Sequence, residues 1–102
     1  MKSLYIFILV GLAANSHSQV TCSEAITSVI LHKNGNIYFK SDKTCSSKWC
    51  QINWPTEEDK NRAFSALLAA KTSSEKIDFY WPSIGACSED NEVYASPDYF
   101  HY

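Results

Sequence analysis

An apolar run precedes every cysteine of this chain, and this arrangement restricts what the chain can fold into more than any other feature. Residues 4–14 are almost wholly apolar, follow Lys2, and lie before all four cysteines. A basic start and about eleven apolar residues are typical of a secretory signal peptide and are too short for a membrane span, which needs about 20 residues. We therefore predict that residues 1–18 are a signal peptide and that residues 19–102 form one small exported domain.

The residues just after the apolar run indicate where the signal peptide ends. Small side chains in the segment 16–18 predict cleavage before Gln19, with cleavage before His17 as the alternative. A lipidated Cys22 is disfavoured, because the residue just before it is not Gly, Ala or Ser. A buried N-terminal helix is disfavoured too, because the run shows no amphipathic stripe. Export predicts a secreted or periplasmic protein that has no stable membrane insertion once the signal peptide is cut.

Charge and aromatic content restrict the partners of residues 19–102. Without Lys2, eight Lys and Arg residues face eleven Asp and Glu residues, a net charge of about −3. An acidic chain does not suit nucleic acid or an anionic membrane, because both attract basic surfaces. Aromatic residues make up 14% of the chain. Large rings and cross-links offset the small core that so short a domain can bury.

Strand-type composition in one segment and alternation of apolar and polar residues in others predict four strands in the first 81 residues. Residues 26–33 are rich in β-branched and apolar side chains, Asn34-Gly35 predicts a type I′ turn, and residues 36–41 return as the second strand. Residues 49–54 and 76–81 each place alternate apolar residues on one buried face.

A helix and a short last strand complete the prediction. Thr56 can cap a helix that ends near residues 71–73, and the acidic residues after Thr56 suit the positive end of the helix dipole. Its buried stripe is predicted to consist of Ala63, Phe64, Leu67, Leu68 and Ala70. A fifth strand is expected at residues 92–95, and the aromatic tail, residues 96–102, is expected to pack on the domain.

The element order β-β-β-α-β-β predicts a fold that is mainly β with one helix, a five-stranded OB-like barrel stabilised by disulfides. In that topology the first strand pairs with both the second and the fourth. Cys22 then lies beside Cys87, which leaves Cys45 for Cys50. Four cysteines allow three pairings. A zinc site built from them is the alternative in a reducing compartment, but export favours disulfides.

The sequence contains no recognisable catalytic set. His32 and His101 lie in no known motif, and the acidic residues 57–59 are explained by the helix dipole. We therefore predict a non-enzymatic protein without cofactor or metal. Exposed rings can stack on sugars or pack on a partner chain, so the candidate ligand-binding residues are Trp49, Trp81 and Tyr94.

Several segments together carry a resemblance to known proteins. They are residues 34–39 (Asn-Gly-Asn-Ile-Tyr-Phe), Cys45, Trp49-Cys50, residues 66–71 (Ala-Leu-Leu-Ala-Ala-Lys), residues 77–81 (Ile-Asp-Phe-Tyr-Trp) and residues 95–99 (Ala-Ser-Pro-Asp-Tyr). This set resembles a group of short exported proteins from marine gammaproteobacteria across nearly all of residues 19–102. The group has no assigned activity, so the resemblance implies none.

A looser similarity is to the OB-fold B subunits of AB5 toxins, the subtilase-cytotoxin B subunit in particular. It rests on the signal peptide, the strand order, and the helix followed by an aromatic strand. It implies ring assembly and glycan binding. The chain is shorter, places its cysteines differently and has no matching sugar-site motif, so no binding residue is carried over from that family.

These observations predict an exported, non-enzymatic binding module with a glycan or protein ligand, and self-association is a further expectation. One alternative is a periplasmic structural or accessory protein without a small ligand. The other is a small inhibitor of an exported enzyme, which would use the loop at residues 42–48.

Overall fold

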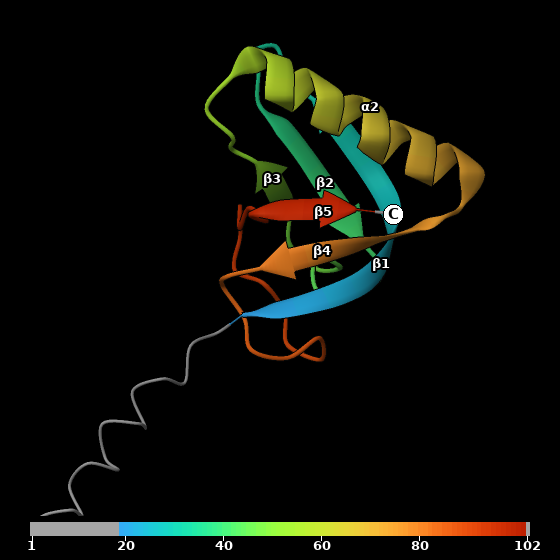
Figure 1. Cartoon of the computed structure of the whole chain (residues 1–102), viewed down its shortest axis with the longest axis vertical. Coiled ribbons are helices and arrows are strands. Elements are labelled where there is room, and N and C mark those ends of the chain that lie inside the picture. The colour runs from blue at the N-terminus through green and yellow to red at the C-terminus, as the bar shows by residue number, and fades with distance from the viewer. Residues whose placement is uncertain (1–18, 102) are drawn as a thin grey trace, which may run out of the picture.

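The computed structural model describes residues 19–101, which form a five-stranded antiparallel sheet crossed by one helix (Figure 1). The predicted signal peptide lies outside the described residues. The elements are β1 (Val20–Leu31), β2 (Ile37–Ser41), β3 (Cys50–Ile52), α2 (Glu57–Ser73), β4 (Lys76–Trp81) and β5 (Tyr99–His101). The fold is thus mainly β with one helix, as predicted.

The long strand β1 belongs to both halves of the sheet and pairs with a different strand in each half. Its first half pairs with β4, from Val20 opposite Trp81 onward, and its second half pairs with β2, ending with Leu31 opposite Ile37. The register shifts between Ile26 and Ser28, where a bulge lets the strand bend. The curve of β1 from one half of the sheet to the other is visible in Figure 1.

The strand order is β3-β2-β1-β4-β5, so β3 and β5 are the two edges of the sheet. Between residues 19 and 101 no strand ladder joins these two edges, and the sheet is not closed into a barrel. The closed barrel expected from the sequence is therefore not confirmed.

Several strand boundaries differ from the prediction. The third strand covers only Cys50–Ile52 of the predicted residues 49–54. The first strand was expected to begin at Ile26 but begins at Val20, since its first half carries small and polar residues that give a weak strand signal. The predicted strand at residues 92–95 is wrong, because that segment turns. The last strand is instead β5, inside the expected tail, where it pairs with β4.

The connection between β1 and β2 also differs in detail. A type I′ turn needs positive φ at both central residues. Here only Gly35 has positive φ (92°), and the amide of His32 donates to the carbonyl of Asn36 at 2.9 Å. The hairpin therefore uses a loop of three residues, 33–35, and the glycine supplies the one conformation that other residues rarely adopt.

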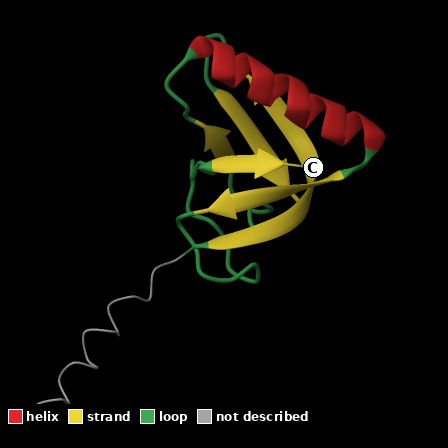
Figure 2. Ribbon diagram, in the orientation of Figure 1, coloured by secondary structure: helices red, strands yellow, loops and turns green. Residues whose placement is uncertain are grey.

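The core lies between the sheet and α2, which crosses one side of the sheet (Figure 2). The rings of Phe39, Phe79 and Trp81 stack at the centre, with centroids 5.3 to 6.3 Å apart. The helix begins where predicted, with Thr56 Oγ1 accepting from Asp59 N at 3.1 Å. Its buried stripe is narrower than expected, because Leu68 is 45% exposed.

Two disulfides fasten the sheet to its loops, in the pairing predicted. Cys22 at the start of β1 is bonded to Cys87 after β4, and Cys45 is bonded to Cys50 at the start of β3. The Cα atoms lie 5.6 and 5.9 Å apart, which is the usual separation for such bonds. The longer link closes 65 residues of chain, so it restricts the unfolded state most.

A buried carboxylate ties the loop before β3 to the sheet. Glu24 is fully buried, and its carboxylate accepts hydrogen bonds from the Thr44 backbone amide (2.9 Å) and Trp81 Nε1 (2.8 Å). The hydroxyl groups of Ser41 and Thr44 donate to it as well. Asn91 Nδ2 donates to Thr44 Oγ1 at 3.0 Å, which brings in the segment after β4. These five residues, called the Glu24 cluster below, fix the course of the chain into β3.

Candidate functional site

Aromatic side chains gather on the outer face of the β1-β2-β3 half of the sheet. They line a hollow of about 250 Å³ formed by Ile30, His32, Tyr38, Trp49 and Tyr94, which we call the aromatic groove. Its residues come from the end of β1, from the loop that follows it, from β2, from the residue before β3 and from the segment after β4. The fold therefore brings together residues up to 64 positions apart.

Strand alternation places Tyr38 in the groove. Ile37 and Phe39 are buried, so Tyr38 between them points to the other face of the sheet. Ile30 is its partner on β1 and lies on the same face. The His32 and Tyr38 rings meet edge to face with their centroids 6.3 Å apart, so these two rings form one wall of the groove along the hairpin.

Trp49 forms the opposite wall and contacts a cation. It is half-buried, and Lys40 Nζ lies 4.8 Å from the centre of its ring. A cation at this distance is attracted by the electron-rich ring face. This contact holds the indole in place and puts a positive charge beside the groove.

Tyr94 reaches the groove through an unusual backbone conformation. Its φ is 64°, a value that costs a bulky residue energy. The conformation is held by β3, because Tyr94 N donates to Trp49 O at 2.6 Å and Gln51 Nε2 donates to Tyr94 O at 3.0 Å. The centroid of the Tyr94 ring lies 5.4 Å from that of the Tyr38 ring, and the residue is 51% exposed.

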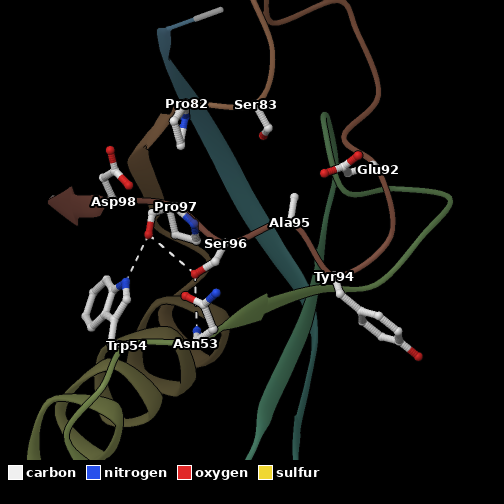
Figure 3. A pocket seen from close by; sticks show the side chains of 10 residues that line it. All are labelled: Asn53, Trp54, Pro82, Ser83, Glu92, Tyr94, Ala95, Ser96, Pro97 and Asp98. Carbon is white, nitrogen blue, oxygen red and sulfur yellow. Dashed lines mark hydrogen bonds between the residues drawn. The ribbon is translucent and has the colours of Figure 1, made fainter.

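A second hollow of about 420 Å³ lies on the other side of this segment (Figure 3). Trp54 Nε1 donates to Pro97 O at 2.9 Å, and Asn53 N donates to Ser96 Oγ at 3.2 Å, so its walls are fastened to each other. The Tyr94 ring points away from the other side chains that line this hollow (Figure 3). Its remaining lining residues are Pro82, Ser83, Glu92, Ala95 and Asp98. The two charged ones are acidic, in contrast to the aromatic groove.

Two of the three predicted ligand-binding residues lie at the surface, and the third is buried. Trp49 and Tyr94 line the same groove. Trp81 is fully buried with its indole N–H bonded to Glu24, so it is wrong as a surface candidate. Its place at an inward position of β4 follows from the same alternation that exposes Tyr80 more.

Sequence reasoning missed three residues of the groove, which are Ile30, His32 and Tyr38. Tyr38 had a usable signal, because it falls on the polar face of a predicted strand. Ile30 and His32 had none, since they look like ordinary residues at the end of an apolar strand. Glu24 was also missed, because a lone carboxylate between Ser23 and Ala25 gives no sign of burial.

The loop proposed for enzyme inhibition is buried at its centre and exposed on both sides. Thr44 and Cys45 are buried and belong to the Glu24 cluster and the short disulfide. The other five residues of the loop are exposed, which are Asp42, Lys43, Ser46, Ser47 and Lys48. The exposed part therefore consists of two short stretches, residues 42–43 and 46–48, with buried residues between them.

Comparison with known proteins adds no assignment. The chain matches no family model, no curated protein and no solved structure. Among residues 19–101, no three side chains of His, Cys, Asp or Glu gather in a way that could hold a metal ion. The same part of the chain contains no helix with the length and apolar character needed to cross a bilayer.

Proposed function

We propose that the chain is an exported, non-enzymatic binding module that holds its ligand in the aromatic groove. The observation that carries this proposal is Tyr94. Hydrogen bonds to Trp49 and Gln51 hold this tyrosine at positive φ, yet the conformation leaves its ring half exposed beside Tyr38 instead of burying it in the core. Strain and exposed rings at one place are typical of binding sites, because a ligand can use the ring faces that the core does not.

We also propose that the sheet is an opened OB-type barrel. The strand order is the one expected for that fold if its last contact, between β3 and β5, is left out. Residues 94–97 run beside β3 in this gap, where Gln51 N donates to Ala95 O at 2.9 Å. This arrangement supports a relation to OB-fold binding modules, in which glycan or protein ligands and ring assembly are the expectations from the sequence.

Export is part of the same proposal. The two disulfides are compatible with a protein that folds outside the cytoplasm. Mass spectrometry of protein purified from the periplasm or the medium tests it. We expect an N-terminus at Gln19 and a mass about four units below that of the reduced form, because each disulfide removes two hydrogens. An intact Met1 with four free thiols would contradict export.

Binding is tested on a glycan array and on a peptide library with the exported protein. We expect a ligand whose binding is lost in Tyr94→Ala and kept in Tyr99→Ala. Tyr99 is a matched control, since it is 50% exposed, stacks on Tyr80 at 5.0 Å and lies in β5, outside the groove. Equal losses in both variants, or no binding by folded protein on either panel, would refute the proposal. Light scattering on the same sample tests self-association.

A further inference from the structure

The chemistry of the aromatic groove narrows the ligand, provided that the proposed function holds. We infer that the groove binds a proline-rich peptide segment that carries acidic residues. This segment would lie in the extended polyproline II conformation across Tyr38, Trp49 and Tyr94. The inference rests on four properties of the groove, which are its size, its polar groups, its neighbouring strand edge and its charge.

The groove is too small to enclose a free small molecule. Pockets for small ligands usually measure about 300–1,000 Å³ and cover most of the ligand. The aromatic groove measures about 250 Å³ and is open. It suits a short stretch of a longer chain, whose other residues remain in solvent.

The polar groups of the groove suit a peptide better than a sugar. A sugar carries a hydroxyl on most ring carbons, and each hydroxyl that is buried needs a partner. No carboxylate or amide lines the groove. Two side-chain amides that contact the tyrosines of the groove each have an N–H engaged within the protein, because Asn36 Nδ2 donates to the Tyr38 hydroxyl at 2.9 Å and Gln51 Nε2 donates to the Tyr94 carbonyl.

Strand addition at the groove is blocked. The edge of β3 beside Trp49 is taken by the segment after β4, through hydrogen bonds from Tyr94 N to Trp49 O and from Gln51 N to Ala95 O. A peptide must therefore be recognised through side chains. A polyproline II segment suits this requirement, because it has no internal hydrogen bonds, loses little entropy on binding, and docks in aromatic grooves. The indole N–H of Trp49 and the hydroxyl of Tyr94 are donors for its carbonyl oxygens.

The positive charges near the groove indicate that the ligand is negatively charged. Lys40 lies against Trp49, and the groove residues His32 and Trp49 are each next in the chain to an exposed lysine, Lys33 and Lys48. No acidic residue lines the groove, although residues 19–102 carry a net charge of about −3. Local positive charge in an acidic protein favours a ligand with carboxylates.

The test uses labelled synthetic peptides of about nine residues, long enough at about 3.1 Å per residue to cross the groove. One peptide is proline-rich with two glutamates, a second replaces the glutamates by glutamine, and a third replaces the prolines by alanine. Binding to the exported protein is followed by fluorescence anisotropy. We expect the first peptide to bind best. Trp49→Ala and Tyr94→Ala should each weaken it about tenfold or more, with Tyr99→Ala unchanged.

Lys40→Met separates charge from packing, because methionine keeps an unbranched side chain against Trp49. It should weaken the acidic peptide and leave the glutamine peptide unchanged. Equal binding of the alanine peptide would overturn the inference. Glycan binding in the groove without peptide binding would overturn it as well, while the proposed function would stand. Failure of folded protein to bind either class would refute both.

Discussion

Two sets of aromatic side chains lie on opposite faces of the same sheet and are held there in different ways. The inner rings are those of Phe39, Phe79 and Trp81, and the groove rings are those of Tyr38, Trp49 and Tyr94. The inner rings are fully buried and stacked on one another. The groove rings are partly exposed, and they are held by a lysine contact and by one strained backbone residue.

The comparison teaches that position, rather than residue type, separates core from surface here. Tyr38 and Phe39 are neighbours in β2, yet they belong to different sets, because successive side chains of a strand point to opposite faces. The inner rings should therefore govern stability and the groove rings should govern binding. Four predictions test this division, from the largest expected effect to the smallest.

Removing an inner ring should unfold much of the protein. We expect Trp81→Ala to lower the free energy of unfolding by about 4–5 kcal/mol, because it leaves a cavity and deprives Glu24 of a hydrogen bond. Urea unfolding followed by circular dichroism measures the change. A loss below about 1 kcal/mol would mean that the inner rings do not carry the stability, and the division would fail.

The Cys22–Cys87 disulfide should contribute more to stability than the Cys45–Cys50 disulfide. We expect Cys22→Ser to lower stability by about 4 kcal/mol and Cys50→Ser by about 2 kcal/mol, because the first link closes the much longer loop. The melting temperatures of the two variants provide the measurement. Equal melting temperatures would show that loop length does not decide the effect.

The Glu24 cluster connects the two sets, since it bonds Trp81 on one side and fixes the loop before Trp49 on the other. We expect Glu24→Gln to lower the free energy of unfolding by about 2–3 kcal/mol. The carboxylate accepts every one of its hydrogen bonds, whereas the glutamine NH₂ group is a donor and would face the N–H and O–H donors around it. Chemical denaturation measures the change. The charge-matched variant Glu92→Gln, at an exposed residue, should change stability by less than about 0.5 kcal/mol. Equal stabilities would contradict the structural role of Glu24.

Changes at Tyr94 should have the smallest effect on stability. We expect Tyr94→Gly to be more stable than Tyr94→Ala by about 1 kcal/mol, because only glycine adopts positive φ without a steric cost. Paired urea titrations compare the two variants, and the binding panels should show that both have lost the ligand. If the alanine variant is the more stable one, the backbone of Tyr94 is not strained. The positive φ of Tyr94 would then no longer support a binding site in the aromatic groove.

Local patterns predicted most of the elements. Alternation placed β2 and β4, the cap at Thr56 placed the start of α2, and the element order paired the cysteines. The first half of β1 could not be predicted, because its small and polar residues form a strand only when β4 pairs with it. β5 was not predicted either, because a strand of three residues is too short to show an alternation of apolar and polar side chains.

The candidate site was predictable only in part. Trp49 and Tyr94 stood out as rings that a small core could not hide. Trp81 was a candidate as well, although alternation in residues 76–81 already placed it on the buried face, and it is buried. The sequence could not predict that Trp49 and Tyr94 line one groove, because residues 45 positions apart meet only in the assembled fold.

The sequence by itself determined the secondary structure of residues 36–81 and the pairing of four cysteines, because alternation, capping and loop closure act over short stretches of chain or through strand order. Only the tertiary structure decided that the sheet stays open and that Tyr94 meets Tyr38 and Trp49. The physical reason is that the conformation of Tyr94 is unfavourable on its own. It exists because β3 offers hydrogen-bonding groups at the required place, and no local pattern records that.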